Sequence, residues 1–219
     1  MSRDHPDWLA ADFAVLMEPT DGVIEGGCQG TLRADIITRG KRAHSARSWL
    51  GVNAIHAVGE VLARLNAYEA RRPVVDGLEY HEGLNAVAVR GGVAGNVIPD
   101  EAGVMVNYRF APDLSLEQAE QHVREVFDGF EVVITDGAPA ARPGLTHPVA
   151  AAFVAAVGGI PRAKLGWTDV ARFSALDIPA VNYGPGDPNL AHQQGEYASL
   201  TKIAESELGM LNWLTTPTI

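Results

Sequence analysis

The sequence has a single cysteine, Cys28, so the chain can form no internal disulfide. A lone thiol agrees with a reducing compartment, and it excludes a metal site built from several thiolates. A metal ion would therefore need histidine and carboxylate ligands in this chain. The first residues, MSRDHPDW, are polar and acidic and do not resemble a secretory signal. We therefore expect a cytoplasmic protein.

Positive charge and long apolar runs are also scarce. The chain carries 17 Lys and Arg residues against 27 Asp and Glu residues, a formal net charge of −10, and the basic residues form no cluster. This balance argues against a nucleic acid partner, because phosphates need positive charge to bind. No apolar run approaches the ~20 residues that cross a bilayer, so no membrane partner is expected. Small molecules or other proteins remain as partners.

The two ends of the sequence have the texture of one α/β domain. An apolar run at residues 13–17 is typical of a buried strand, and it places Glu18 at that strand's carboxyl end. Further along, the pattern predicts a helix at residues 147–159, a buried strand at 178–184 and a helix at 201–214. In the last helix we expect Ala204, Leu208 and Leu211 to form one apolar side.

Between these ends the periodicity changes to that of an antiparallel sheet with helices. Leu32, Ala34 and Ile36 alternate with polar residues, as in a half-buried strand. The expected elements, in chain order, are a strand at 31–40, one long helix at 45–70, strands at 84–92 and 103–112, a helix at 115–129 and a strand at 130–137. Ser115 and Gln118 form a capping-box pattern at the second helix. This β-α-β-β-α-β order is the ferredoxin-like α+β motif.

The fold class predicted is therefore α/β, with a ferredoxin-like domain inserted into another domain. A stretch rich in Gly, Pro and Ala at residues 136–146 marks the second boundary. We expect residues 1–26 and 137–219 to be two parts of the interrupted domain, and residues 27–136 to be the ferredoxin-like domain.

Two residue types suited to a metal follow predicted strands. Glu18 and His192 each come after a strand of the α/β part, and loops at the carboxyl ends of such strands gather ligands. We therefore expect them to converge. A carboxylate and an imidazole suit zinc, but a zinc site needs at least three protein ligands. Taken alone, His192 is more often a surface-loop histidine than a metal ligand.

Six motifs in order carry a resemblance to a known family. They are MEPTDG, GCQGTLRADIITRGKRAHSA, GGVAGNVIPD, NYRFAP, GWTDVARF and GPGDPNLAHQQGEY. In this order they resemble the clan of co-catalytic zinc aminoacylases and carboxypeptidases, and within it the succinyl-diaminopimelate desuccinylase family. The resemblance covers the chain from about residue 6 onward. It implies a zinc-peptidase-like catalytic domain interrupted by a ferredoxin-like dimerisation lid, a homodimer formed through that lid, and two zinc ions, which cobalt can replace, in each complete site.

The resemblance also assigns roles to single residues. Glu18 matches the carboxylate ligand of one zinc ion, and His192 matches the imidazole ligand of the second. His44 matches a lid histidine that reaches the partner subunit's active site and donates a hydrogen bond to the developing oxyanion. The alternative for His44 is an ordinary solvated residue just before a helix.

Four further residues match positions that bind substrate. Asn96 and Arg109 match lid positions, and Thr168 and Arg172 match the loop that holds a substrate carboxylate. The alternative for Arg109 is a surface salt bridge. The alternative for the Thr168 loop is a turn in which Thr168 or Asp169 caps the following helix.

The reaction implied is hydrolysis of N-succinyl-LL-2,6-diaminopimelate to succinate and LL-diaminopimelate, a step of lysine and cell-wall biosynthesis. The family's His-x-Asp motif, bridging aspartate and Glu-Glu pair precede the MEPT strand, and none of the three is in this sequence. We therefore read the chain as the carboxyl-terminal portion of such an enzyme and expect it to be inactive by itself. Acetylornithine deacetylase or aminoacylase activity, or a non-catalytic dimerisation module, are the alternatives.

Overall fold

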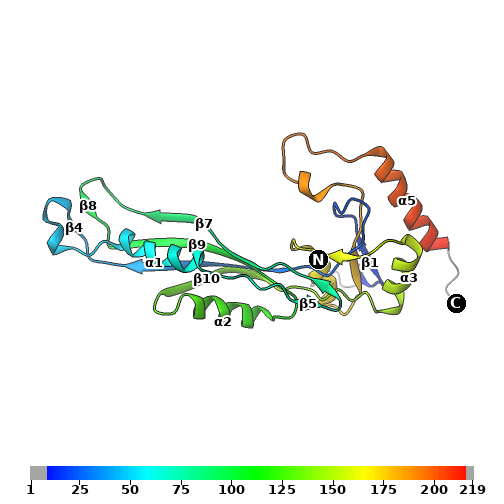
Figure 1. The fold of residues 1–219 in the computed structure, drawn as a ribbon, viewed down its shortest axis with the longest axis horizontal. Coiled ribbons are helices and arrows are strands. Elements are labelled where there is room, and N and C mark those ends of the chain that lie inside the picture. Colours follow the sequence, from blue (N-terminus) through cyan, green and yellow to red (C-terminus); the bar gives the residue numbers. More distant parts are fainter. Residues whose placement is uncertain (1–8, 216–219) are drawn as a thin grey trace. The chain divides into compact units, whose positions relative to one another are not determined.

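A computed structural model describes residues 9–215 of the chain (Figure 1). The described residues form two compact units, which we call the insert unit and the flanking unit. The insert unit comprises residues 30–73 and 81–140, and the flanking unit comprises residues 9–29, 74–80 and 141–215. Residues 74–80 fall within the predicted ferredoxin-like domain, whereas in the structure they belong to the flanking unit. Their hairpin packs there, with the Tyr80 hydroxyl donating to the Gly26 carbonyl at 2.8 Å.

The insert unit is a four-stranded antiparallel sheet with two helices. Its main elements are β3 (Gly30–Arg39), α1 (Ala54–Asn66), β7 (Gly83–Gly91), β9 (Glu101–Phe110), α2 (Leu116–Val126) and β10 (Glu131–Ala138). The strands lie in the order β10-β3-β9-β7, and each neighbouring pair is antiparallel. The ferredoxin-like prediction is therefore confirmed.

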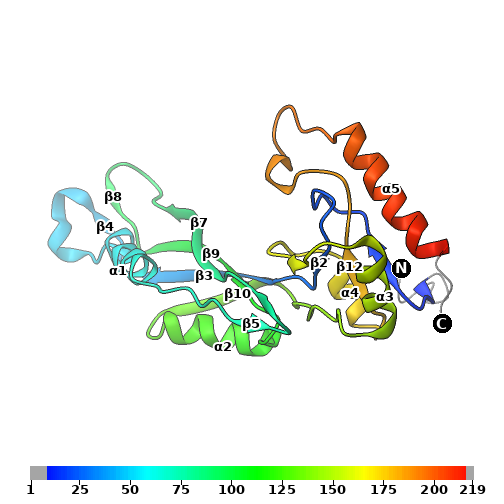
Figure 2. The ribbon, with the colours of Figure 1, turned by 45° about the vertical axis from the view of Figure 1, so that its right-hand side comes forward.

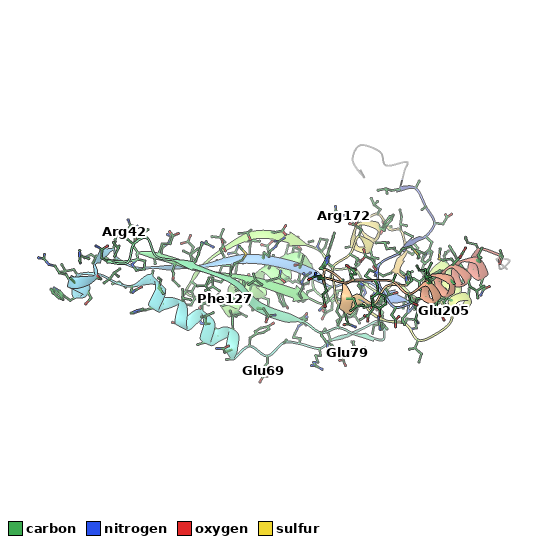
Figure 3. The ribbon with its side chains drawn as sticks, turned by 90° about the horizontal axis from the view of Figure 1, so that it is seen from above. Arg42, Glu69, Glu79, Phe127, Arg172 and Glu205 are labelled. Carbon is green, nitrogen blue, oxygen red and sulfur yellow. The ribbon has the colours of Figure 1, made fainter. Side chains whose placement is uncertain are left out.

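One apolar core joins this sheet to both helices. It contains alternate residues of β3 (Leu32, Ala34, Ile36), together with Val58 and Val61 of α1, Ala119 and Val123 of α2, and Phe127 (Figure 3). Both helices therefore cover the same face of the sheet. On β9 the alternation is equally clear, because Val106 and Tyr108 are fully buried while Asn107 and Arg109 are only half-buried. Arg109 thus lies on the face away from the core, as its spacing predicts.

The start of α2 has the capping box that the sequence predicts. The Gln118 backbone amide donates to the Ser115 hydroxyl at 3.2 Å, and the Ser115 amide donates to Gln118 Oε1 at 2.8 Å. These two bonds satisfy backbone donors that the first helical turn leaves without partners.

The prediction of one continuous helix over residues 45–70 is wrong. The structure has a 3₁₀ segment η2 (Ser45–Leu50) and then a separate helix, α1. Between them, the Val52 backbone exchanges hydrogen bonds with Lys41 at 2.8 and 2.9 Å, and the Asn53 side chain accepts from the Ile55 amide at 2.9 Å as the N-cap of α1. A long-range bridge and a local cap therefore divide the helical pattern.

The flanking unit contains a second, smaller sheet (Figure 2). Its strands are β1 (Ala14–Leu16), β2 (Glu25–Gly26), β11 (Arg162–Ala163) and β12 (Ala180–Asn182), in the order β1-β12-β2-β11. The hairpin β5 (Val74–Val75) and β6 (Leu78–Glu79), the helices α3 (Pro148–Val157), α4 (Val170–Ser174) and α5 (Leu200–Thr215), and the 3₁₀ turn η3 (Pro188–Leu190) complete the unit. Pro148 begins α3 and Gly158 ends it with a φ of 80°, as the sequence predicts.

The buried side of α5 differs from the prediction. Leu208 and Leu211 are 57% and 49% exposed, whereas Ser206 and Gly209 are buried. The reason is close packing, since a Cβ added to Gly209 would lie 2.6 Å from the Tyr183 hydroxyl. The helix packs on its neighbours with Ser206, Gly209, Met210 and Trp213, and its leucines face outward. No helix in the described part of the chain is long and apolar enough to cross a membrane.

Candidate functional site

The loops that carry Glu18 and His192 begin side by side in the flanking unit. Strands β1 and β12 are parallel neighbours, with Leu16 paired to Asn182. Their carboxyl ends therefore lie at the same edge of the sheet. Glu18 is the second residue after β1, and the segment from Gly184 to His192 follows β12. The sheet therefore gives the two loops a common starting edge.

Hydrogen bonds join these two loops. The Thr20 hydroxyl donates to the Gly184 carbonyl at 3.1 Å and accepts from the Gly184 amide at 3.0 Å, and Thr20 is fully buried. The amides of Asp21 and Gly22 donate to Gly186 and Gly184 carbonyls at 2.7 and 2.8 Å. A Cβ added to Gly184 would lie 2.4 Å from the Glu18 carbonyl oxygen. Glycine is required there because the two backbones touch.

His192 lies in an exposed part of its loop. Its φ of 62° is in the left-handed region, which is unfavourable for a residue with a Cβ. Its backbone amide donates to Glu196 Oε2 at 3.2 Å. Strain of this kind is stored at functional sites when surrounding contacts maintain it. The structure therefore marks His192 as a constrained loop residue.

The described residues supply only part of a metal site. A carboxylate from Glu18 and an imidazole from His192 have the donor chemistry that zinc prefers. Within residues 9–215, however, no group of three or more His, Cys, Asp or Glu side chains could hold a metal ion. Because a zinc site needs at least three protein ligands, these residues cannot complete one by themselves.

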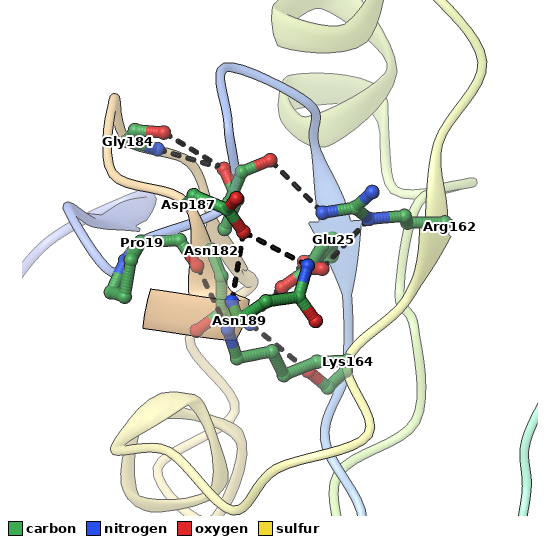
Figure 4. A network of polar contacts seen from close by, with 10 residues as sticks. Pro19, Glu25, Arg162, Lys164, Asn182, Gly184, Asp187 and Asn189 are labelled. Atoms are coloured by element: carbon green, nitrogen blue, oxygen red, sulfur yellow. Dashed lines mark hydrogen bonds and ion pairs between the residues drawn. The ribbon is translucent and has the colours of Figure 1, made fainter. Parts of the chain in front are cut away.

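A buried charge cluster that the sequence motifs do not indicate lies beside the Glu18 loop (Figure 4). Glu25 is 5% exposed and Lys164 is 8% exposed, and Lys164 Nζ lies 2.8 Å from Glu25 Oε2. Arg162 Nε donates to Glu25 Oε1 at 2.8 Å. The alternation of Arg162, Ala163 and Lys164 is a strand signal, but strand β11 is too short for periodicity to reveal it.

The loop between β11 and α4 carries Thr168 and Arg172. Thr168 is 5% exposed, and its hydroxyl makes no hydrogen bond of good geometry within the described residues. Asp169 is the N-cap of α4 but makes no side-chain cap bond. Neither residue therefore caps the helix through its side chain, so the alternative reading of this loop is wrong.

Arg172 is largely exposed (Figure 3). Its Nε donates to Asp169 Oδ1 at 2.6 Å, and its guanidinium carbon lies 5.4 Å from the centre of the Trp167 ring. Behind the loop, Cys28 Sγ donates to the Thr168 carbonyl at 3.7 Å. Burial raises the pKa of the Cys28 thiol more than its hydrogen bonds lower it. A buried, protonated thiol is a packing residue rather than a nucleophile.

In the insert unit, the structure brings His44 and Asn96 together. Strand β4 (Ala43–His44) pairs antiparallel with β8 (Val97–Ile98), and the Ser45 amide donates to the Asn96 carbonyl at 2.9 Å. The His44 Nδ1 accepts from the Ala46 amide at 3.0 Å. A neutral imidazole that accepts at Nδ1 carries its proton on Nε2. His44 therefore offers Nε2–H as a hydrogen-bond donor to a ligand.

Arg109 on β9 differs from the paired arginines around it. It is half-buried, and its guanidinium forms no hydrogen bond or ion pair within residues 9–215. Desolvation lowers the pKa of its guanidinium, and the positive charge of Arg33 lowers it further. The expected alternative, a surface salt bridge, is not observed in the described residues. A desolvated cation without a carboxylate partner is a favourable site for an anionic ligand.

The paired strands β4 and β8, which we call the His44 ribbon, lie far from Arg109 within the insert unit. Strand β8 leads into β9 at Glu101, whereas Arg109 lies near the other end of β9. The step from Glu101 to Arg109 spans about 27 Å at the usual rise of an antiparallel strand. Figure 1 shows β4 and β8 beyond the end of the sheet at which β9 begins. Side chains cannot bridge this separation, so these groups cannot meet in one copy of the unit.

Comparison with known proteins shows which protein family the chain resembles. Residues 27–131 match the family model of the M20 peptidase dimerisation domain. The fold resembles a tripeptidase of Staphylococcus aureus, with a TM-score of 0.73 and 20% identity over 94% of this chain and 57% of that one. It also resembles an M20 family metallo-carboxypeptidase of Sulfolobus solfataricus, with a TM-score of 0.69 and 16% identity over 97% of this chain and 65% of that one. The chain therefore carries a dimerisation domain of the M20 peptidases at residues 27–131, and its fold resembles that of M20 family enzymes.

The sequence is also similar to succinyl-diaminopimelate desuccinylases. The enzyme of Corynebacterium glutamicum is 50% identical over 92% of this chain and 56% of its own length. A Mycobacterium tuberculosis protein provisionally named for the same activity is 64% identical over 93% of this chain and 58% of its own length. The chain thus spans somewhat more than half the length of these relatives.

Proposed function

We propose that this chain forms part of a zinc-dependent amide hydrolase that removes the succinyl group from N-succinyl-LL-2,6-diaminopimelate, which yields succinate and LL-diaminopimelate. The structural observation that carries the proposal is Arg109, a half-buried guanidinium without a carboxylate partner in the described residues. The substrate bears several carboxylates, which a guanidinium binds through two parallel hydrogen bonds. The identity to the Corynebacterium glutamicum enzyme supports the choice of substrate.

In this proposal the flanking unit holds part of the metal site and part of the substrate site. Glu18 and His192 are ligands of two zinc ions, which cobalt can replace, and the remaining ligands and the general base come from outside residues 9–215. Bound zinc supplies Lewis acidity and makes water a competent nucleophile at neutral pH. The buried hydroxyl of Thr168 and the guanidinium of Arg172 bind a carboxylate of the substrate. The enzyme acts in the cytoplasm, where the Cys28 thiol stays reduced.

A homodimer completes the substrate site. Because the His44 ribbon and Arg109 lie at opposite ends of β9, they can serve one substrate only when two copies contribute. His44 and Asn96 of one copy then act with Arg109 of the other, and His44 donates its Nε2–H to the developing oxyanion. Strand β7 is at an edge of the sheet, with Val87 and Val89 56% and 57% exposed, and this edge suits pairing with a second copy.

The test of the proposed reaction compares this chain with a lengthened enzyme, in which the unmatched part of the Corynebacterium glutamicum relative is added to it. Succinate release from N-succinyl-LL-2,6-diaminopimelate is measured with zinc present. We expect release by the lengthened enzyme and none by the 219-residue chain. Faster hydrolysis of N-acetylornithine would reject the substrate, and a folded, zinc-loaded lengthened enzyme that hydrolyses neither compound would reject the reaction.

Replacing Arg109 with alanine should reduce kcat/KM of the lengthened enzyme by about 10- to 100-fold. The estimate follows from the ~1.5–3 kcal/mol that a hydrogen bond to a charged group contributes. Steady-state kinetics measure the effect, and far-UV circular dichroism checks the fold. The matched control is Arg124→Ala, because Arg124 donates to the Val132 carbonyl on the exposed side of α2. An Arg109→Ala enzyme with unchanged kcat/KM would contradict the assignment.

Mixing two strongly impaired variants should restore activity if the site is shared between copies. One variant carries His44→Ala and the other Arg109→Ala, each in the lengthened enzyme. After dissociation and reassociation, half of the dimers are mixed, and each mixed dimer has one intact site of two. Activity should therefore recover to about a quarter of the unmutated value. If both residues served the site of their own chain, the mixture would stay strongly impaired.

A further inference from the structure

We propose that Lys164, together with Glu25 and Arg162, is a positioning residue that holds the turn after Glu18 in place. The inference rests on the proposed function, because Glu18 is a metal ligand only within it. Nothing in the sequence motifs points to these three side chains. Their role follows from where the two cations direct their hydrogen bonds.

The local fold places the three charges on one face. Strands β2 and β11 are parallel, and Arg162 is paired with Glu25. Because side chains alternate along a strand, Lys164 lies on the same side as Arg162, with Ala163 on the other. Backbone bonds fix Lys164 further, since its amide donates to the Gly26 carbonyl at 3.2 Å and its carbonyl accepts from Gln29 at 3.2 Å. These backbone bonds fix the position of Lys164, and its ammonium group therefore lies beside the buried carboxylate of Glu25.

Both cations also reach the backbone of the Glu18 turn. Lys164 Nζ donates to the Pro19 carbonyl at 3.4 Å, and Arg162 Nη2 donates to the Thr20 carbonyl at 3.1 Å (Figure 4). The cluster has two positive groups and one negative group, so its surplus positive charge faces carbonyl dipoles. Hydrogen bonds from charged donors are stronger than neutral ones. The two carbonyls that receive them come immediately after Glu18.

This turn needs such support because its backbone is strained. Asp21 has a φ of 55° and is followed by Gly22 with a φ of 71°, so two successive residues are in the left-handed region. A non-glycine residue in that region persists only when neighbouring contacts hold it. Lys202 also donates to the Asp21 carbonyl, at 3.2 Å, but its side chain is 36% exposed. The Lys164 side chain is only 10% exposed, so its charge is far less screened by water.

Native-state hydrogen exchange of the 219-residue chain, without metal or substrate, tests the proposal. In Lys164→Met, the amides of Asp21 and Gly22 should lose protection by about tenfold, because their bonds to the Gly186 and Gly184 carbonyls open more often. The Tyr183 amide, which donates to Leu16 at 2.9 Å in the neighbouring strand pair, should change by less than about twofold. Lys202→Met is the matched control and should leave all three amides nearly unchanged.

A double variant covers the case in which Lys164→Met does not fold, because that change leaves Glu25 with one cation fewer. Glu25→Gln combined with Lys164→Met removes both charges and should fold, yet it should still lose protection at Asp21 and Gly22. Equal loss at the turn and at Tyr183 would show a global stability effect and overturn the proposal. Unchanged exchange at the turn would overturn it as well.

Zinc binding by the same variants separates this proposal from the proposed function. Competition with a chromophoric chelator measures the zinc affinity of the lengthened enzyme and of the same enzyme carrying Glu18→Gln or Lys164→Met. We expect both substitutions to weaken binding, and Lys164→Met by the smaller factor. Should Glu18→Gln leave zinc affinity unchanged, Glu18 is not a ligand and the proposed function fails, while the exchange result still decides whether Lys164 holds the turn.

Discussion

Replacing Arg71 with methionine should lower the free energy of unfolding by about 3 kcal/mol. The carboxylate of Glu82 is fully buried and receives Arg71 Nη2 at 2.6 Å and Arg71 Nε at 3.0 Å. It also accepts from the Tyr108 hydroxyl at 2.8 Å and the Ala111 amide at 2.9 Å. Without Arg71, these neutral donors alone must stabilise a buried negative charge. Urea unfolding followed by far-UV circular dichroism measures the change.

The matched control for this prediction is Arg42→Met. Arg42 also binds a carboxylate through two nitrogens, at 3.0 and 2.8 Å, but its partner Asp100 is 42% exposed. Exposed pairs of this kind contribute less than about 1 kcal/mol. Equal effects of the two substitutions would mean that burial of the acid is irrelevant. Adding Glu82→Leu to Arg71→Met should recover part of the loss, because it removes the buried charge.

The same network anchors the end of β9 that carries Arg109. Glu82 lies just before β7, and Ala111, which donates to it, lies just after β9. Tyr108 is adjacent to Arg109 in the strand, and burial followed by its bond to Glu82 raises the pKa of its hydroxyl well above the ordinary value. The hydroxyl is therefore a donor to Glu82 throughout the range in which proteins work. This rigid end of the sheet suits a substrate-binding arginine.

Replacing Gly184 with alanine should lower the free energy of unfolding by about 3 kcal/mol. The new Cβ would meet the Glu18 carbonyl oxygen at 2.4 Å and Met17 backbone atoms at 3.0 Å. These are backbone atoms, so the turn itself must move and its bonds to Thr20 must lengthen. For a chain of this size the melting temperature should fall by roughly 6 to 12 °C. Differential scanning calorimetry measures the shift.

Gly166→Ala is the control for this second prediction. Gly166 belongs to the same unit, and a Cβ there would meet only Lys164 Cε, at 4.0 Å. We expect its melting temperature to stay within about 2 °C of the unmutated chain. If Gly184→Ala melted no earlier than this control, the contact between the Glu18 and Gly184 loops would be looser than the structure shows.

The elements with strong periodicity were predictable from the sequence. The ferredoxin-like order, the capping box at Ser115 and the outward face of Arg109 all follow from local patterns. The break before α1 did not, because it depends on the bridge between Lys41 and Val52. The buried side of α5 depends on how closely Gly209 approaches Tyr183. Both are long-range contacts that override a helical pattern.

The residues of the candidate site also fall into two groups, those that the sequence indicates and those that only the structure reveals. The motifs identify Glu18, His192 and Arg109, and strand order explains why the Glu18 and Gly184 loops lie together. The cluster of Glu25 and Lys164 is not predictable from the sequence, because β2 and β11 are too short for periodicity to show which of their charged residues are buried. Only the fold shows that these charges are buried and paired. Convergence of the Glu18 and His192 side chains on metal stays a prediction.

The separation of Arg109 from the His44 ribbon has a genetic consequence. If each site draws residues from two copies of the chain, as proposed, a cell with one normal and one His44-defective allele would assemble mixed dimers with one working site. Two alleles damaged at opposite ends of the sheet would complement each other, whereas two alleles damaged at the same end would not. Intragenic complementation would therefore map which end of the sheet each mutation disables.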